Sequence, residues 1–327
     1  MIAFLGTGLL GANFTRALLK KGGKVNVWNR TALKAKELEV FGAVAFDQAA
    51  DAVKGVDRIH LTLSDDQSVD EVLENASAGF KTGVIIVDHT TTSAKGAARR
   101  SGYWKNKGYN YLHAPVFMGP PNALEGTGVM LISGDQQLVH HLETALSEMT
   151  GKLVNLGEDP AKAAAIKLLG NLFHISLTGG ISDLLTLADS LKVPASELGT
   201  LLELLNPGVV AQGRLRKITS NTFDQPSWEL SMARKDARLM MEQVASTQNS
   251  LMVVPAVAKK MDAWLERGKG KNDWTIISQD PKLSFSGNRQ TGTGRCGLIG
   301  EFSFHYRAVN RNILIKHYDV GILAYGQ

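Results

Sequence analysis

The chain has 327 residues, of which 44% are hydrophobic and 20% are charged. This composition is ordinary for a soluble globular protein, and the length predicts about two domains. The 36 Lys and Arg residues exceed the 31 Asp and Glu residues, so the formal net charge is +5. Residues 281–327 carry +4 of this surplus and residues 1–280 only +1. The nearly neutral body argues against a nucleic-acid partner.

Cys296 is the only cysteine, which excludes an intramolecular disulfide framework and a cysteine-rich metal site. No run reaches the roughly 18 apolar residues that a membrane span needs. The N-terminus lacks the basic start and the small-residue cleavage site of a signal peptide, and no histidine has a partner at metal-ligand spacing. We therefore expect a cytoplasmic protein that binds no metal and no membrane.

The first 160 residues alternate short apolar runs with amphipathic stretches. Helices are expected at 10–21, at 32–41 and from about residue 68. Strands are expected at 2–5, 24–28, 43–46, 58–63, 84–87, 111–116 and 129–133. Strands separated by helices predict βαβ units and a mostly parallel sheet, so residues 1–160 are expected to form a doubly wound α/β domain.

The pattern changes after residue 160, because helical periods replace strands. One long helix is expected over 161–191, interrupted only by Gly170 and the pair Gly179-Gly180. Further helices are expected at 195–205, 208–219, 228–247 and 252–267. Residues 161–280 thus read as an all-α domain for substrate binding and oligomerisation, joined through the long helix.

The tail at 281–327 begins rich in Gly, Ser, Asn and Arg and shows no clear helical period. It is interpreted as a disordered or artificially added extension, or else as a docking or swapping segment. Deleting it is expected to leave activity intact and to bring the isoelectric point toward neutrality.

A glycine motif follows the first expected strand and opens the first helix. Gly6, Gly8 and Gly11 fit the pattern G-x-G-x-x-G, and a second strand closes the unit within 30 residues. This context is typical of a Rossmann-like dinucleotide site, in which glycines allow a tight turn, approach of the pyrophosphate and close helix packing. Helix amides then meet the phosphates. The residues expected to bind the cofactor here are Gly6, Thr7, Gly8, Leu9, Leu10 and Gly11.

The residues after the second strand bear on cofactor choice. Sites for NAD usually place an Asp or Glu there to bind the ribose 2′-hydroxyl, whereas this chain has Asn29, Arg30 and Thr31. Arg30 is suited to pair with a 2′-phosphate. We therefore expect NADP(H) in preference to NAD(H), the alternative being that Arg30 is merely solvated and NAD is also used.

The long helix carries a row of polar residues on one face. Lys167, Asn171, His174 and Thr178 follow one another at i, i+4, i+7 and i+11. A lysine facing an interdomain cleft, with an amide one turn away, would have a lowered pKa that favours proton transfer. Taken alone, however, the pattern is more typical of a solvated lysine.

Five segments in order resemble the β-hydroxyacid dehydrogenase family, which includes 3-hydroxyisobutyrate dehydrogenases and glyoxylate/succinic semialdehyde reductases. The resemblance covers about residues 1–280. The segments are the glycine motif at 6–11, D-H-T-T at 88–91, A-P-V-F-M-G at 114–119 with Gly126, K-L-L-G-N at 167–171, and Lys235-Asp236.

The resemblance implies a role for each matching position. Lys167 would be the catalytic acid/base, and Asn171 would hold substrate or orient Lys167. Leu63, Ser64 and Thr91 would line the cofactor. Lys235 would reach over the cofactor from the helical domain, although without the resemblance Lys235-Asp236 would read as a solvated pair.

The substrate segment departs from the family pattern. Thr90 stands where Ser is usual, and Phe117-Met118-Gly119 replaces the S-G-G that receives a substrate carboxylate. Two bulky apolar side chains would narrow or redirect that anion pocket. The residues expected to meet substrate are Thr90, Phe117, Met118, Gly119 and His174, with His89 as a further candidate.

The resemblance implies an NADPH-dependent oxidoreductase that reduces a small aldehyde or keto acid. The apolar Phe117-Met118 pair is also similar to imine reductases, a related group that usually has Asp or Tyr in place of Lys167. A catalytically inactive dinucleotide-binding regulatory module is the third hypothesis, against which Lys167 and Asn171 argue. A homodimer or homotetramer is expected, because the family's helical domain commonly pairs with another subunit.

Overall fold

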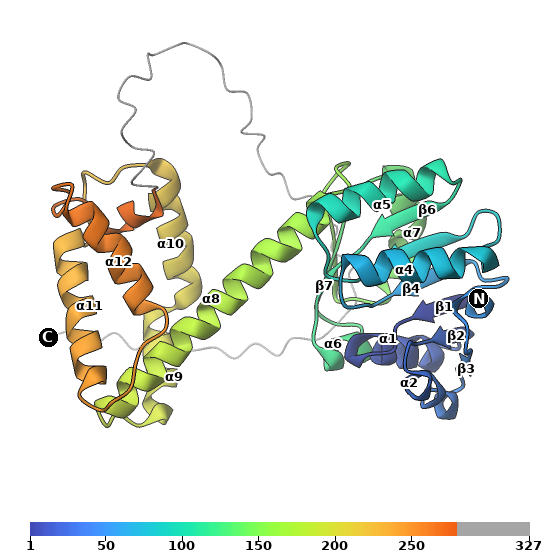
Figure 1. Ribbon diagram of the computed structural model, residues 1–327, viewed down its shortest axis with the longest axis horizontal. Coiled ribbons are helices and arrows are strands. Elements are labelled where there is room, and N and C mark those ends of the chain that lie inside the picture. The colour runs from blue at the N-terminus through green and yellow to red at the C-terminus, as the bar shows by residue number, and fades with distance from the viewer. Residues whose placement is uncertain (280–327) are drawn as a thin grey trace, which may run out of the picture.

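The computed structural model describes residues 1–279, so the expectations for the tail at 281–327 lie outside the described residues. Figure 1 shows an α/β part and a separate group of helices, with one long helix running between them. The expected order of an α/β domain followed by a helical one is confirmed.

The α/β part is built on a six-stranded sheet in the order β3-β2-β1-β4-β5-β6, and every neighbouring pair is parallel. Its central strands are nearly continuous apolar runs, because helices cover both faces. The strands are β1 (Ile2–Leu5), β2 (Val25–Trp28), β3 (Val44–Ala45), β4 (Arg58–Leu61), β5 (Ile85–Asp88) and β6 (Asn110–His113).

Two apolar cores, one on each face, hold the helices to this sheet. The helix expected at 32–41 was too long: α2 is short, and a 3₁₀ turn at Glu39–Phe41 follows it and ends at Gly42, whose φ is 95°. The helices of this part are α1 (Leu9–Lys20), α2 (Ala32–Lys36), α3 (Ala49–Ala52), α4 (Asp66–Ala76) and α5 (Ala94–Asn106).

A second, three-stranded sheet follows β6 and was not foreseen. The single strand expected at 111–116 was wrong, because the chain leaves the first sheet after His113 and joins the second at Val116. Strand β9 was also missed, since its burial is only partial. The elements are β7 (Val116–Phe117), α6 (Pro120–Glu125), β8 (Val129–Ile132), α7 (Gln136–Ser147) and β9 (Lys152–Asn155).

The helical part agrees closely with the periodicity of the sequence. Its core contains Leu230, Met261 and Trp264. Asp183 joins two of its helices by accepting the amides of Met252, Val253 and Val254 at 2.7–3.0 Å. The helices are α8 (Lys162–Ser190), α9 (Ala195–Leu205), α10 (Pro207–Ser220), α11 (Leu230–Ala245) and α12 (Val254–Leu265), with a 3₁₀ turn at Trp274–Ser278.

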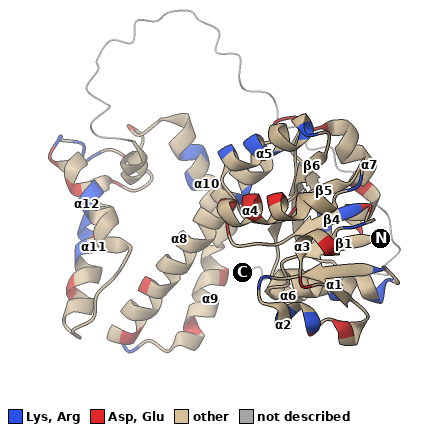
Figure 2. Ribbon diagram, turned by 45° about the vertical axis from the view of Figure 1, so that its right-hand side comes forward, with Lys and Arg blue, Asp and Glu red and all other residues tan. Residues whose placement is uncertain are grey.

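Helix α8 runs unbroken through Gly170 and through Gly179-Gly180, contrary to the expected interruptions. By length and composition alone it is long and apolar enough to cross a membrane, and 11% of its most apolar window is buried. Its exposed apolar residues are Leu168, Leu169, Leu172, Phe173, Ile175, Leu177, Ile181 and Leu185. In Figure 2 most of α8 is uncharged, while basic and acidic residues alternate over the α/β part.

Candidate functional site

The glycine loop joins β1 to α1 at the carboxyl end of the sheet. Gly6 has φ +92°, and a Cβ there would overlap the Thr62 carbonyl oxygen. A Cβ on Gly11 would overlap the Gly6 carbonyl oxygen, so helix α1 can approach the loop only because both residues are glycine. The tight-turn and helix-packing roles expected from the sequence thus have a direct steric basis.

The middle of the loop is open. A Cβ on Gly8 would meet no atom within 4 Å, and helix α1 begins there with no side-chain cap and no acidic residue in its first turn. Leu9 is 78% exposed at the same end. The unbonded amides and the positive end of the helix dipole therefore face free space, as a dinucleotide pyrophosphate requires.

Thr7 and Asn29 connect the loop to the end of β2. The Thr7 amide donates to Asn29 Oδ1 at 3.0 Å, and Asn29 Nδ2 donates to the Thr31 carbonyl at 3.0 Å. Asn29 therefore shapes the loop through its side chain. The Thr7 hydroxyl is buried and has no hydrogen-bond partner within the described residues.

Arg30 is exposed at the carboxyl end of β2, and no carboxylate in residues 1–279 pairs with it. Lys34 lies one turn further on, exposed on α2, and was not anticipated as a cofactor contact. Residues 29–36 contain no acidic residue, and the cations Arg30 and Lys34 have no carboxylate partner in the described part of the chain. Together with the open loop, they show that the residues present fit an NAD(P) cofactor.

The ends of β4 and β5 form the neighbouring wall. The Thr62 hydroxyl donates to the Gly6 carbonyl at 2.8 Å, and the Leu63 amide donates to Thr90 Oγ1 at 3.0 Å. Thr90 is only 2% exposed, so its hydroxyl serves to join these two strand ends. Ser64 pairs with Ser68, whereas Thr91 is exposed at the same edge. Leu63, Ser64 and Thr91 thus gather beside the glycine loop.

Lys167 lies in the first half of α8 and is 9% exposed. Its Nζ lies 4.3 Å from the centroid of the Phe117 ring, and no carboxylate within the described residues pairs with it. Burial lowers the pKa of Lys167 below its usual value of 10.5. A buried amine whose N–H groups are free of carboxylates is suited to exchange a proton with a substrate.

Phe117 fits against α8 where that helix has no side chain. A Cβ on Gly170 would overlap the Phe117 ring, and the His174 ring lies 6.1 Å from the ring of Phe117. Asn171 is half-buried and lies one turn after Lys167. Its side-chain amide makes no hydrogen bond to the described residues. The structure thus brings Phe117, Lys167, Asn171 and His174 together, and Gly170 makes this possible.

Met118 and Gly119 lie next along the chain. Met118 packs against the core of the α/β part. Gly119 precedes α6, and its amide donates to Asn122 Oδ1 at 2.8 Å. Because α6 packs on α1, the segment 116–119 lies between the glycine-loop helix and α8. The nucleotide end and the lysine end of the site are therefore linked by this segment.

Lys235 lies on α11, in the helical part, where its Nζ pairs with Asp236 at 2.7 Å. Helix α11 packs on α8 and α12, at the end of α8 away from the α/β part (Figure 1). One chain does not bring Lys235 to its own glycine loop. A cofactor role for Lys235 therefore requires a second copy and stays a prediction.

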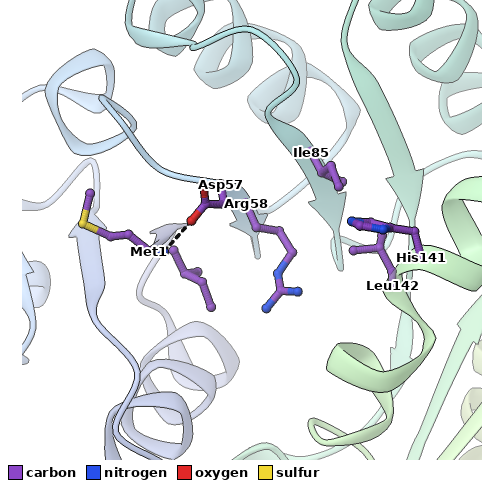
Figure 3. Close-up of a pocket in the computed structure, with 7 residues that line it drawn as sticks. Met1, Asp57, Arg58, Ile85, His141 and Leu142 are labelled. Carbon is purple, nitrogen blue, oxygen red and sulfur yellow. Dashed lines mark hydrogen bonds and ion pairs between the residues drawn. The ribbon is translucent and has the colours of Figure 1, made fainter.

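A separate cavity of about 300 Å³ lies at the opposite edge of the sheet. Figure 3 shows Arg58 extending into it, with Asp57 beside it and His141 on the facing side. Its walls include the first residues of β1, β4 and β5, so it is at the amino ends of the strands, away from the glycine loop. None of the residues expected in the active site lines it.

His89 is buried, only 3% exposed, and points into the core, so the expectation that it touches substrate has no support in its placement. It pairs with His60, which is also buried and which the sequence offered only as a residue of a strand. Among residues 1–279 no group of three or more His, Cys, Asp or Glu side chains is placed to hold a metal ion.

Comparisons with known proteins agree with this geometry. Residues 1–157 match the NAD binding domain of 6-phosphogluconate dehydrogenase. The 3-sulfolactaldehyde reductase of Escherichia coli (strain K12) is 24% identical over 292 residues, which are 86% of this chain and 96% of the relative. Glyoxylate/succinic semialdehyde reductase 1 of Arabidopsis thaliana is 26% identical over 290 residues, covering 86% of this chain and 99% of the relative.

A solved imine reductase from Myxococcus stipitatus, in complex with NADP⁺, has the same fold. The TM-score is 0.75 at 22% identity, over 85% of this chain and 98% of that one. The match with the reductases extends through both the α/β part and the helical part. The chain is thus an NAD(P)-dependent oxidoreductase that is similar in sequence to aldehyde reductases of the β-hydroxyacid dehydrogenase type and shares its fold with an imine reductase.

Proposed function

We propose that the chain is an NADPH-dependent reductase that converts the aldehyde or keto group of a small compound to the hydroxy compound, with Lys167 as proton donor. The observation that carries the proposal is the buried Lys167 ammonium, which has an aromatic ring beside it and no carboxylate partner in residues 1–279. The related enzymes named as aldehyde reductases support the same chemistry.

The cofactor preference is argued from charge. Arg30 and Lys34 are exposed and unpaired by described carboxylates where a 2′-phosphate would lie, and no Asp or Glu is present there to hold a 2′-hydroxyl. NADPH, when bound, supplies the hydride. The chain's own part is to hold the pyrophosphate on the amides of α1 and the 2′-phosphate on Arg30.

Lys167 supplies the proton. In the direction of reduction its Nζ–H donates to the substrate oxygen as negative charge develops there, and in the reverse direction the neutral amine accepts the alcohol proton. The lowered pKa brings both forms of the amine closer to equal population near neutral pH. Asn171, one turn away with an unbonded amide, holds the substrate or orients Lys167.

The wall opposite Lys167 favours substrates with an apolar group beside the carbonyl. Phe117 and Met118 offer no hydrogen-bond donor from their side chains, and Thr90 is buried. A compact keto acid would place its carboxylate against these apolar groups, which is unfavourable. We therefore rank longer aldehydes, such as a semialdehyde, above glyoxylate.

The apolar wall and the shared fold also favour a second candidate function, the reduction of an imine. One experiment separates the possibilities: NADPH and NADH absorbance followed with glyoxylate, succinic semialdehyde and a cyclic imine. Faster turnover of the semialdehyde with NADPH is the expected result, whereas turnover of the imine alone would favour the second function. Binding of NADPH without turnover of any compound would contradict both functions and favour a regulatory module.

We also propose that the protein is a homodimer through the exposed apolar face of α8. Monomers rarely expose continuous apolar patches beyond a few hundred Å². Helices α9 and α10 also expose apolar residues, namely Leu204, Leu205 and Val209. A second copy laid on α8 would enclose Asn171 and His174, which one chain leaves open. It would also offer a Lys235 to the cofactor.

A further inference from the structure

Two histidine rings are stacked inside the α/β part, between β4 and the end of β5. His60 is fully buried and His89 is 3% exposed, and their ring centroids lie 5.2 Å apart. Phe4 stacks on His60 at 5.7 Å and Phe14 on His89 at 5.3 Å. Four rings thus fill the core directly beneath the glycine loop and helix α1.

Hydrogen bonds connect the two imidazoles in a chain that begins at Arg58. Arg58 Nε lies 3.0 Å from His60 Nε2, and His60 Nδ1 lies 2.9 Å from His89 Nε2. His89 Nδ1 lies 2.8 Å from the Ala114 carbonyl oxygen. We name Arg58, His60, His89 and the Ala114 carbonyl the histidine relay.

Each tautomer in the relay follows from the donor before it. The arginine Nε can only donate, so His60 Nε2 must accept and His60 must carry its proton on Nδ1. His89 Nε2 then accepts, and His89 in turn carries its proton on Nδ1. The Ala114 carbonyl can only accept, so both ends of the relay require the same arrangement.

The last acceptor of the histidine relay is the backbone carbonyl of Ala114. Ala114 is fully buried at the point where the chain leaves β6 for β7, and its amide donates to the Asp88 carbonyl at 2.7 Å. A buried carbonyl without a partner is costly. His89 supplies that partner, and the three residues that follow lead to Phe117, whose ring lies on Lys167.

We propose that His60 and His89 are positioning residues, which hold Ala114 through the relay and thereby place the Phe117 wall against Lys167. The proposal rests on the proposed function, because it treats Lys167 as the proton donor. His89 sets the exit of the chain from the first sheet, and His60 keeps His89 in the tautomer that can donate to Ala114. Neither ring touches the substrate.

Burial supports the neutral state that the relay needs. It lowers the pKa of His89 to about 4 and lowers the pKa of His60 well below the usual 6.5, with His89 and then Arg58 opposing a charge on His60. The Ala114 carbonyl and Asp88 favour a charge on His89, while His113 and Arg58 oppose it. Desolvation outweighs these contributions, so both rings stay neutral at physiological pH.

The direct test is imidazole ¹⁵N NMR of the full chain, which reads tautomers without any need for activity. At pH 7.5 we expect His60 and His89 each to have a protonated Nδ1 and an unprotonated Nε2. Both rings should remain neutral down to pH 6. His60→Phe removes the donor to His89 Nε2 and leaves the Ala114 carbonyl alone to fix the tautomer, so we expect the Nδ1-protonated form of His89 to become less populated. An Nε2-protonated or charged ring in the unmodified protein would overturn the proposal, whether or not any substrate is turned over.

Kinetics then separate positioning from mere stability. His89→Phe keeps the ring stack but leaves the Ala114 carbonyl unpaired, and we expect kcat to fall about 10- to 100-fold while the Kd for NADPH changes less than about 2-fold. His89→Asn keeps a side-chain N–H close to the place of Nδ1, so it should restore kcat to within about 5-fold of the wild type.

The matched control is Asn26→Leu, which removes a buried side-chain bond to the Ala52 carbonyl at 2.8 Å, far from Ala114 in the chain. We expect it to lower stability as His89→Phe does but to leave kcat unchanged. Equal loss of kcat in both variants, or no rescue by His89→Asn, would assign His89 a purely structural role. Absence of turnover in the unmodified protein would instead refute the proposed function, with the tautomers still open to measurement.

Discussion

The Lys167 ammonium faces the ring of Phe117 at 4.3 Å and has no acidic partner in the described part of the chain. An aromatic face attracts a cation by about 0.5–2 kcal/mol, depending on its exposure to water. Burial opposes the charge and lowers the pKa of Lys167 below its usual value. Unlike a carboxylate, the ring accepts no strong hydrogen bond, so the N–H groups remain available to a substrate oxygen.

Replacing Lys167 tests the proton transfer. Lys167→Met should lower kcat about 10²- to 10⁴-fold with NADPH binding retained. Lys167→Arg should fail to rescue, because a guanidinium keeps its proton at all accessible pH values. Lys259→Met, at an exposed site on α12, is the control and should behave as the wild type. Turnover that survives in Lys167→Met would refute the assignment.

The pH dependence of kcat follows from the same lysine. Reduction needs the protonated amine, so kcat should be level at low pH and fall as the pH rises through a midpoint below 10.5. Oxidation of the alcohol needs the neutral amine and should rise through the same midpoint. Both profiles are measured in buffers of constant ionic strength, and a midpoint at or above 10.5 would contradict the effect of burial.

Gly170 and Phe117 are expected to depend on one another. Alanine in place of glycine inside a helix normally stabilises by about 0.5–1 kcal/mol. Because a Cβ on Gly170 would overlap the Phe117 ring, we expect Gly170→Ala instead to lower both stability and kcat. The double variant Gly170→Ala with Phe117→Leu should recover stability in a double-mutant cycle. If Gly170→Ala were more stable than the wild type, the Phe117 ring would not lie against Gly170.

Arg30 should determine the cofactor preference. Arg30→Ala is expected to raise the KM for NADPH about 10- to 100-fold, since a charge-assisted hydrogen bond to phosphate is lost, and to change the KM for NADH by less than about 2-fold. Lys36→Ala, next to the same site but paired with Asp47 at 3.9 Å, provides the control. Equal effects on both cofactors would rule out recognition of the 2′-phosphate by Arg30.

Acid should destabilise the fold in the range where histidine titrates. The pKa values of His60, His89 and His113 are all lowered by burial, so below pH 6.5 the unfolded chain binds more protons than the folded one. Stability is therefore complete above about pH 6.5 and falls as the pH decreases toward the folded pKa values. We expect His89, whose pKa is about 4, to contribute a loss of about 1 kcal/mol between pH 6.5 and 5.5, with further losses from His60 and His113. Urea unfolding at both pH values measures the total loss, and His60→Gln should make it smaller.

The proposed dimer can be tested on its exposed face. Ile175 is 72% exposed on α8, and a lysine there would place a charge inside the interface. Ile175→Lys should shift the sedimentation of the protein from that of a dimer to that of a monomer. It should also lower kcat, because the second copy no longer encloses the site. The control variant Val40→Lys changes a residue of the α/β part that is 82% exposed, and this variant should remain dimeric. A wild-type monomer at micromolar concentration would contradict the proposal.

The sequence by itself determined the parts of this protein that depend on local patterns. The glycine spacing and the flanking strands predicted the nucleotide loop, because only glycine permits the left-handed turn at Gly6 and the close approach at Gly11. Helix α8 was expected to within a residue at each end, since its 3.6-residue period is unbroken by proline. The mostly parallel sheet also followed from the alternation of strand and helix, although the order of its strands did not.

Only the tertiary structure decided where the chain changes sheets and what meets Lys167. The chain leaves the first sheet at Ala114, whose carbonyl accepts a hydrogen bond from His89, 25 residues earlier. No local sequence pattern contains that information. The burial of Thr90, the ring of Phe117 over Lys167 and the notch at Gly170 are likewise contacts between distant segments. Periodicity reports which face of an element is apolar, whereas packing determines which atoms touch, and the chemistry of this site depends on those contacts.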